Sequence, residues 1–370
     1  MKNKYLVILI FFFLIISCHS RPKTPDTNIE NKRDTLTLIA AGDNLFHDSV
    51  IRSHLVDQEK RVYDFSPIYT EIKNIAQRAD ISFINQETVM AGTRFGYSGF
   101  PLFNTPQSLA GTLVDTGFEI FNLANNHAMD MGTSGLYATL DFLDTIEGIT
   151  VIGARKEGPS ARIITKDDVK FGFLAYTFSL NGIALPRDNP NLVSMIVREK
   201  MTEEINDLRP LCDFLIVSMH WGAEYVLEPG KDQTDLAQFL AELNVDLIIG
   251  HHPHVLQRVD TITLPNGRKT VVFYSLGNFV SHQRERERII GGIAVVNFNI
   301  KEMEISDVGM IPVVTHFDRN FRNTKIYPLS SYTNELLEEH ALKNTGNGLS
   351  MDFFNTVTQR LKTTVYDTLP

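Results

Sequence analysis

Residues 36–41, LTLIAA, form a short apolar run that ends directly in Gly42-Asp43-Asn44. Runs rich in Ile, Val, Phe and Leu are typical of strands that are buried on both faces. The same arrangement, an apolar run followed at once by polar residues, recurs along the chain. The further examples are DISFI (80–84) before Asn85-Gln86-Glu87, EIFNLA (119–124) before Asn125-Asn126-His127, FLIVSM (214–219) before His220-Trp221-Gly222, and VDLIIG (245–250) before His251-His252-Pro253-His254.

Helix-like segments separate these apolar runs, at residues 67–79, 135–143, 201–211 and 232–243. Strands that alternate with helices predict an α/β fold with a sheet covered on both faces. Open α/β sheets bind their ligands in the crevice outside the carboxyl ends of the strands. The sequence therefore predicts that five strand ends deliver Asp, Glu, Asn and His side chains to one edge of the molecule.

The residue types at this edge are those of metal ligands. Neutral imidazoles, carboxylates and an amide carbonyl suit Zn²⁺, Mn²⁺ or Fe, and the absence of thiolates argues against a structural zinc site. The chain contains only Cys18 and Cys212, too few for a disulfide scaffold. A lone strand-end histidine would more often be a core residue than a ligand, but five such strand ends favour a shared site.

These motifs resemble those of the CapA family, the bacterial capsule-synthesis proteins associated with poly-γ-glutamate, which are similar in fold to calcineurin-like metallophosphoesterases. The resemblance extends over about residues 35–314. It implies a layered α/β/β/α sandwich with the site at the carboxyl ends of the strands. The motifs that carry it are Ala41-Gly42-Asp43, Asn85-Gln86-Glu87, Leu123-Ala124-Asn125-Asn126-His127 with Asp130 and Gly132, Ser218-Met219-His220-Trp221-Gly222, Gly250-His251-His252-Pro253-His254, and Ser275-Leu276-Gly277-Asn278-Phe279.

The resemblance also implies a role for the motif residues. Glu87 would bridge two metal ions, Asp43 and His254 would bind the first ion, and Asn126 would bind the second through its amide oxygen. His127 would not bind metal but would face the substrate as an acid or as a donor to developing charge. The expected cofactor is one or two divalent ions of Mn, Zn or Fe. The full set of expected metal ligands is Asp43, Glu87, Asn126, His220, His252 and His254.

Two positions depart from the metallophosphoesterase pattern. Those enzymes usually carry His two positions after the first Asp, where this chain has Leu45, and the nearest histidine is His47. The bridging acid is Glu87 instead of Asp. The site is therefore expected either to hold one tight and one loose ion or to recruit His47 in place of the missing imidazole. Two-metal hydrolysis depends on both ions, so a weakened site would favour binding without turnover.

The sequence leaves the roles of four neighbouring motifs open. His251 is expected behind the ligands or exposed, because adjacent strand residues point in opposite directions. Asn278 is expected to contact substrate through its amide, or to form a plain turn with Gly277. Asp130 could hold an imidazole nitrogen. The run QRERER (283–288) could offer its arginines to an anionic substrate, but its alternating glutamates favour a solvated loop.

Composition excludes several classes of protein. The chain has 370 residues, of which 43% are hydrophobic and 21% charged, so a disordered, collagen-like, coiled-coil or polytopic membrane protein is disfavoured. The net charge is -9 and no long basic run occurs, so we expect no nucleic-acid partner. The chain lacks a Walker-type glycine-rich loop and a Gly-x-Ser-x-Gly elbow, so we expect neither ATP-driven ligation nor hydrolysis by a nucleophilic serine.

The N-terminus is predicted to be a lipoprotein signal peptide over residues 1–17. Lys2 and Lys4 precede an apolar run of 12 residues (5–16), which is shorter than the roughly 20 residues of a membrane span. Residues 15–18, IISC, resemble the bacterial lipobox, so Cys18 is expected to carry lipid. An ordinary signal peptide is the alternative. We expect a flexible tether over 18–34, the CapA/metallophosphoesterase-like domain over 35–318 and a C-terminal helical extension over 319–370.

Together these features predict an extracytoplasmic, membrane-anchored lipoprotein of the cell envelope. A capsule-synthesis protein of the CapA type would use a metal-dependent, hydrolase-like site to act on or bind an anionic surface polymer such as poly-γ-glutamate. The expected partners are that polymer or a phosphate-containing substrate, the membrane and a capsule synthesis or export complex. The alternatives are a metal-dependent phosphoesterase and a non-catalytic component that binds or exports polymer.

Overall fold

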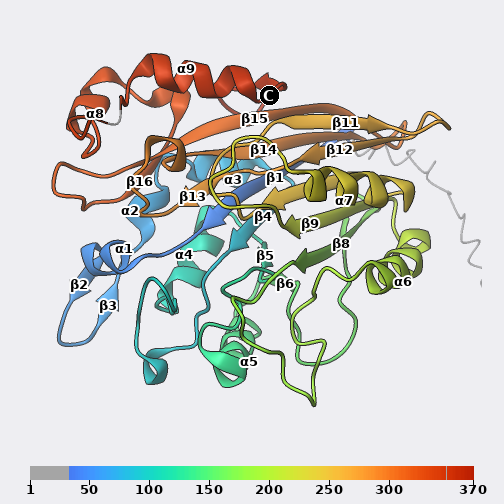
Figure 1. Ribbon diagram of the computed structural model, residues 1–370, viewed down its shortest axis with the longest axis horizontal. Coiled ribbons are helices and arrows are strands. Elements are labelled where there is room, and N and C mark those ends of the chain that lie inside the picture. Colours follow the sequence, from blue (N-terminus) through green and yellow to red (C-terminus); the bar gives the residue numbers. More distant parts are fainter. Residues whose placement is uncertain (1–32, 347) are drawn as a thin grey trace, which may run out of the picture. The chain divides into compact units, whose positions relative to one another are not determined.

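Two β-sheets lie face to face in the described part of this computed structural model, residues 33–346 and 348–370 (Figure 1). The strands of the first sheet are β1 (Thr35–Asn44), β4 (Ile81–Gln86), β5 (Ile120–Asn122), β6 (Thr150–Ile152), β13 (Asn278–Val280), β14 (Ile290–Asn299), β15 (Glu304–His316), β16 (Lys325–Pro328) and β17 (Thr364–Val365). Their order is β16-β15-β14-β1-β4-β5-β6, while β13 pairs with β1 and β17 with β15.

The second sheet has the order β11-β12-β10-β9-β8-β7. Its strands are β7 (Arg162–Lys166), β8 (Val169–Thr177), β9 (Phe214–His220), β10 (Leu247–His251), β11 (Val259–Thr263) and β12 (Lys269–Phe273). A separate hairpin pairs β2 (Leu55–Asp57) with β3 (Val62–Tyr63). The predicted leader (1–17), Cys18 and all but the last two residues of the predicted tether lie outside the described residues.

Helices cover the outer face of each sheet. The helices packed on the first sheet are α1 (Asp48–Ser53), α2 (Ser66–Tyr69), α3 (Lys73–Arg78), α4 (Ser108–Thr116) and α5 (Gly132–Leu143). Those on the second sheet are α6 (Arg198–Leu208) and α7 (Lys231–Glu242), and the chain ends with α8 (Asn334–Glu339) and α9 (Met351–Arg360). Among the described residues, no helix combines the length and the apolar character that a bilayer crossing requires.

The buried strands explain this layering, because their side chains alternate between two apolar layers. In β1, Leu36 and Leu38 join the core between the two sheets, whereas Ile39 packs under the helices of the first sheet. In β9, Ile216 faces the same central core and Leu215 packs under α6 and α7. Each fully buried side chain of this size stabilises the fold by about 1.5–3 kcal/mol. The predicted α/β/β/α sandwich is therefore confirmed.

Parallel pairing aligns the strand ends at one edge. Strands β1, β4, β5 and β6 run parallel in the first sheet, and β8, β9, β10 and β12 run parallel in the second. Two glycines allow neighbouring backbone segments to approach each other closely at this edge. A Cβ atom on Gly42 would lie 2.2 Å from the Gly277 carbonyl oxygen, and one on Gly250 would lie 2.0 Å from that of Tyr274. Any larger residue at either position would push the strand ends apart.

The predicted C-terminal helical extension, residues 319–370, contains more than helices. Besides α8 and α9 it supplies β16, which pairs antiparallel with β15, and β17, which pairs parallel with β15. Phe353 and Phe354 of α9 join the core between the sheets. The segment is thus an integral part of the unit Asp34–Pro370. Its strands are too short to leave an alternating pattern in the sequence.

His340, which follows α8, leads to a prediction about acid stability. The Leu342 amide donates to its Nδ1 at 3.0 Å, and its Nε2 lies 3.2 Å from the Thr315 carbonyl oxygen. The neutral ring satisfies both contacts, whereas a second ring proton would point at the Leu342 N–H. Burial lowers the pKa of His340 to about 4.

As the pH falls, His340 therefore takes up its second ring proton at a higher pH in the unfolded chain than in the folded protein. A histidine with a lowered folded pKa contributes stability above its unfolded pKa of about 6.5, and this stability is lost as the pH falls toward about 4. Each unit of that difference corresponds to about 1.4 kcal/mol. We expect His340→Gln to flatten the fall of the unfolding free energy over this range, measured by urea unfolding with chelator present. Equal pH dependence in variant and wild type would contradict the prediction.

Candidate metal centre

The strand ends bring the six predicted metal ligands to one place. Asp43 lies at the end of β1, Glu87 directly follows β4, and His220 is the last residue of β9. The loop after β10 carries two more of the histidines, and the loop after β5 carries the asparagine. All six side chains are buried: Asp43, Glu87, Asn126, His220, His252 and His254.

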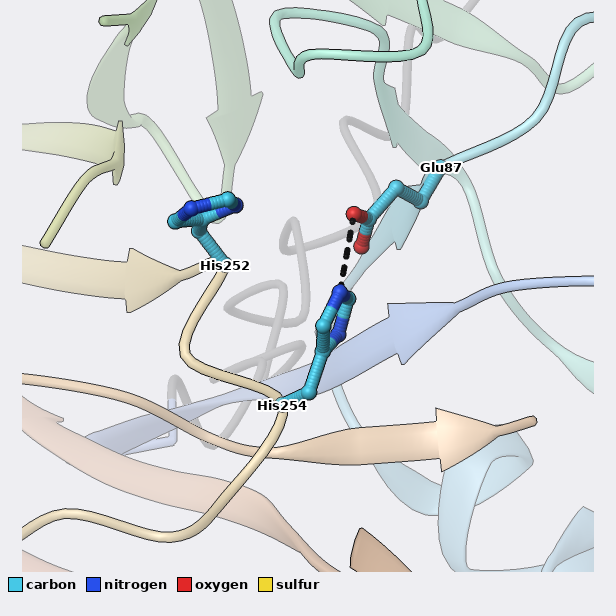
Figure 2. A group of neighbouring side chains, drawn as sticks. All are labelled: Glu87, His252 and His254. Atoms are coloured by element: carbon cyan, nitrogen blue, oxygen red, sulfur yellow. Dashed lines mark ion pairs between the residues drawn. The ribbon is translucent and has the colours of Figure 1, made fainter. Parts of the chain in front are cut away.

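Five of these residues form two overlapping groups that could hold a metal ion. One group is Glu87, His252 and His254, the other is Asp43, Glu87 and His220, and within each the ligand atoms lie within 4.8 Å of one another. Figure 2 shows the Glu87 carboxylate directed at the His254 ring, with His252 on the same loop as His254. Glu87 Oε1 lies 3.7 Å from His254 Nε2 and 3.6 Å from His220 Nε2. Glu87 thus occupies the position that a bridging carboxylate would need.

The two carboxylates of the centre differ in their electrostatic surroundings. Burial alone would raise the pKa of Asp43, but contacts with His251 and His254 outweigh it and hold the pKa well below the usual value. Asp43 Oδ2 lies 3.0 Å from His254 Nδ1, and Oδ1 lies 3.4 Å from His251 Nδ1. Burial and the nearby Asp43 raise the pKa of Glu87 well above its usual value. Without a bound cation, the two carboxyl groups of Asp43 and Glu87 together favour one negative charge over two.

The side chains present fit a divalent cation. Glu87 Oε1 and the Nδ1 atoms of His220 and His252 are buried and have no hydrogen-bond partner. An unsatisfied buried polar atom destabilises a fold by about 1–3 kcal/mol, and coordination would remove that penalty. Burial lowers the pKa of His252 to about 4 and that of His220 well below its usual value, so both rings are neutral near pH 7. Neutral imidazoles and carboxylates without thiolates suit Zn²⁺, Mn²⁺ or Fe.

The histidine loop after β10 has an unusual backbone. His252 and His254 have φ angles of 97° and 57°, in the left-handed region that residues other than glycine seldom adopt. Such conformations persist only where the surroundings enforce them, and they concentrate at functional sites. Here the Tyr225 amide donates to the Pro253 carbonyl oxygen at 2.7 Å and the Trp221 amide to that of His251 at 3.1 Å. The two bonds hold the loop in the shape that turns both imidazoles toward Glu87.

The loop after β5 places an asparagine and a histidine beside these ligands. Asn126 Oδ1 lies 2.8 Å from His220 Nε2. His127 Nδ1 lies 2.8 Å from Asp130 Oδ2, which also accepts from the Phe103 amide at 2.7 Å. The contact between Asp130 and an imidazole nitrogen that the sequence suggested is therefore present. Because Nδ1 is engaged, Nε2 is the atom that His127 has available for a substrate.

Two further histidines lie close to the centre. His47 is outside both ligand groups, and its Nδ1 lies 3.2 Å from the His282 amide and 3.2 Å from the Leu45 carbonyl oxygen. His251 is fully buried and stacks on Phe83 with ring centroids 5.6 Å apart. Of the two expected positions for His251, the exposed one is wrong, because the ring is enclosed behind Asp43.

Asn278, which was predicted to contact substrate through its amide, has its amide nitrogen engaged within the protein. The residue is fully buried, and its Nδ2 is within hydrogen-bonding distance of three protein oxygens. These are the His254 carbonyl oxygen at 3.3 Å, Gln283 Oε1 at 3.0 Å and the Arg288 carbonyl oxygen at 2.8 Å. Its two amide hydrogens are shared among these three protein acceptors, whereas its Oδ1 is buried without a hydrogen-bond partner. Asn278 instead connects the histidine loop to the segment around Arg288.

Three asparagines around the centre were given no role from the sequence. Asn85 Nδ2 donates to Asp43 Oδ1 at 2.8 Å and lies 3.2 Å from Glu87 Oε2, while Asn122 donates to Asn85 Oδ1 at 2.9 Å. Asn181 Oδ1 accepts from Asn126 Nδ2 at 3.2 Å. The place of Asn85 beside the bridging acid was the signal that could have indicated its role. Asn181 belongs to a loop without a strand-end motif, so the sequence offered no signal for it.

Sequence comparison now places the chain among known proteins. The family model described as "Bacterial capsule synthesis protein PGA_cap" matches residues 37–283. The chain belongs to this family. The matched region contains every expected metal ligand as well as His127, and the family membership predicted from the strand-end motifs is confirmed.

Two curated relatives are similar to the chain over part of their length. The "PGA biosynthesis protein CapA" of Bacillus subtilis (strain 168) is 33% identical over 214 residues, which cover 55% of this chain and 53% of that protein. The "Capsule biosynthesis protein CapA" of Bacillus anthracis is 27% identical over 209 residues, covering 54% and 48%. The chain therefore spans about half the length of the curated relatives it matches.

Solved structures show a more distant likeness. A phosphatase from Mycoplasma pneumoniae matches with a TM-score of 0.46 at 14% identity, covering 76% of this chain and 94% of that one. A 5′-nucleotidase precursor from Thermus thermophilus matches with a TM-score of 0.44 at 15% identity, covering 76% and 54%.

Proposed function

We propose that this chain is a metal-dependent hydrolase of capsule synthesis that acts on an anionic polymer, such as poly-γ-glutamate, or on a phosphate-containing intermediate. The observation that carries the proposal is the pair of ligand groups that share Glu87, with His127 next to them. The names of the curated relatives, which refer to capsule and PGA biosynthesis, support the choice of substrate.

The residues of the centre suggest how hydrolysis would proceed. Divalent metal, held by Asp43, Glu87 and the histidines, would supply Lewis acidity and a more acidic water. An attacking water would form a bond from its oxygen to the phosphoryl or acyl centre as the bond to the leaving group breaks, and the proton that this water loses would pass to solvent. Asp130 accepts from His127 Nδ1 and fixes the ring, so a proton on Nε2 can pass to the leaving oxygen or nitrogen.

We further propose that the protein acts in the cell envelope, anchored through lipid on Cys18 and working beside a capsule synthesis or export complex. The support is the leader sequence of residues 1–17 followed by Cys18. Metabolic labelling with a fatty acid analogue tests the anchor. Label retained in wild type and lost in Cys18→Ala is expected, whereas equal labelling of both proteins would contradict lipidation at this residue.

Hydrolysis can be tested with the purified full-length protein. With Mn²⁺ or Zn²⁺ present, we expect poly-γ-glutamate to shorten on size-exclusion chromatography and chelator to stop the reaction. Turnover of an aryl phosphate without any effect on the polymer would favour the phosphoesterase alternative. Polymer binding without turnover on either substrate would favour the non-catalytic alternative. Less than one equivalent of bound metal, unchanged by His252→Ala, would contradict the metal centre itself.

A further inference from the structure

Arg288 lies beside the metal centre, at the end of a short 3₁₀ helix, Arg286–Arg288. Its carbonyl oxygen accepts from Asn278 Nδ2, which also lies 3.3 Å from the His254 carbonyl oxygen. Its guanidinium carbon lies 3.5 Å from the ring centroid of Tyr225, and that ring is 6.1 Å from the His254 ring. One asparagine and one tyrosine thus connect Arg288 to a metal ligand.

Alternation with glutamate favoured a solvated loop for residues 283–288, and Arg284 and Glu285 are indeed exposed, but the three arginines of this run also contact aromatic rings. Arg284 stacks over Phe321 at 4.1 Å and Arg286 over Phe353 at 4.6 Å, so each guanidinium of the run rests on an aromatic ring. Arg286 Nε also pairs with Glu287 at 3.0 Å. Of these arginines, Arg288 is the one whose aromatic partner contacts the metal centre.

The Arg288 guanidinium has unused hydrogen-bonding capacity. No carboxylate of residues 33–346 or 348–370 lies within ion-pair distance of it, and its Nε is buried without a hydrogen-bond partner. Stacking on Tyr225 occupies one face of the guanidinium plane but leaves its N–H groups pointing outward in that plane. Tyr225 is 38% exposed, so this position is open to a ligand from solvent.

The charges around the centre explain why such a cation would matter. Asp43, Glu87 and Asp130 lie in the centre, and the exposed Glu224 at its rim acts electrostatically on both Glu87 and His252. An anionic ligand that approaches this edge meets several negative charges. An arginine without a carboxylate partner offsets them and can bind a carboxylate or phosphate through two parallel hydrogen bonds.

We propose that Arg288, stacked on Tyr225, forms a subsite for a second anionic group of the substrate, next to the group that reacts at the metal centre. The inference rests on the proposed function and narrows its substrate. The substrate carries oxyanions on neighbouring repeats, as a γ-linked polyglutamate or a polyphosphate does, and is not an isolated monoanion.

Calorimetric titration of the full-length protein in Mn²⁺ tests the subsite. The probes are γ-linked triglutamate, polyphosphate and, as monomers, free glutamate and inorganic phosphate. Arg288→Gln is expected to weaken binding of the multiply charged probe by about 10- to 100-fold and to leave the matching monomer unaffected. Arg288→Lys is expected to restore binding in part, because it keeps the charge but loses the planar fork. Arg286→Gln is the matched control, since it removes one charge from the same segment.

The outcomes separate this inference from the proposed function. Weaker binding of triglutamate alone identifies carboxylates as the second anion, and weaker binding of polyphosphate alone identifies phosphates. If the wild type binds the probes and Arg288→Gln weakens binding no more than Arg286→Gln does, the subsite is overturned. The proposed function is then unaffected. Failure of the metal-loaded wild type to bind either multiply charged probe would overturn both. Metal analysis of each variant confirms that the centre itself is intact.

Discussion

Glu87→Gln is expected to abolish hydrolysis, to weaken metal binding by at least about 100-fold and to stabilise the metal-free protein. Loss of a group that merely orients a ligand already weakens metal binding by about 10–100-fold, and Glu87 belongs to both ligand groups. The amide keeps the size of the side chain but removes the negative charge that two histidine-bound cations would share. Metal analysis after gel filtration and isothermal titration with Mn²⁺ measure the loss.

The gain in stability follows from the raised pKa of Glu87. In the metal-free protein the folded state holds the carboxyl proton more tightly than the unfolded state, because burial and Asp43 disfavour the charge. Stability therefore falls as the pH rises from the unfolded pKa of about 4.3 through the higher folded pKa. Gln does not ionise, so the variant in chelator should melt a few degrees above wild type at neutral pH and show a flatter pH dependence. A change of 1 kcal/mol shifts the Tm by roughly 2–4 °C in a domain of 150–250 residues.

Glu224→Gln is the matched control for this experiment. It removes one negative charge from the exposed rim, but Glu224 belongs to neither ligand group. We expect its metal content and its melting temperature in chelator to match those of wild type. A Glu87→Gln protein that binds metal normally, or that melts below wild type in chelator, would show that Glu87 is a structural residue and not a ligand.

His127→Ala is expected to lower kcat by about 10²–10⁴-fold, the usual contribution of a positioned general acid. The metal content should stay at the wild-type level, because His127 is absent from both ligand groups and its Nδ1 is engaged by Asp130. Phe103 packs edge-on against the ring at 4.7 Å, so truncation leaves a small gap without exposing the ligands. Steady-state kinetics combined with metal analysis measures the two effects separately.

Asp130→Asn tests the role of the partner. The asparagine can still accept from the Phe103 amide, so the loop should keep its shape while the negative charge behind His127 is lost. We expect a smaller fall in kcat than for His127→Ala, together with a shifted pH profile. If His127→Ala loses its metal along with its activity, or keeps full activity, then His127 does not act as the proton donor.

Much of the centre could be predicted from the sequence because its signal is local. A buried strand requires an apolar run, and the residue at which that run stops marks where the chain leaves the sheet. Asp43, Glu87 and His220 all stand at such points. Parallel pairing aligns the ends of β1 and β4, and the packing of the second sheet against the first brings the end of β9 beside them. The alternation of strands and helices already implied this parallel pairing, and with it the alignment of strand ends within each sheet.

The remaining contacts depend on how loops pack after the sheets have formed. From the sequence, the amide of Asn278 was predicted to contact substrate. In the fold its nitrogen lies within hydrogen-bonding distance of carbonyl oxygens from two loops. Asn181 reaches Asn126 from a segment without any motif. The C-terminal strands β16 and β17 are formed by pairing with β15, since neither has enough residues to show a pattern of its own.

By itself, the sequence determined the α/β class and the edge at which the ligands gather, because both follow from the apolar or polar character of neighbouring residues, while the resemblance of its motifs implied the layered sandwich and the family. Only the tertiary structure decided which of these groups meet: Glu87 with two sets of histidines, and Arg288 with Tyr225. The physical reason is distance along the chain. Contacts between side chains from separate loops are set by the close packing of the whole core, which no short stretch of sequence encodes.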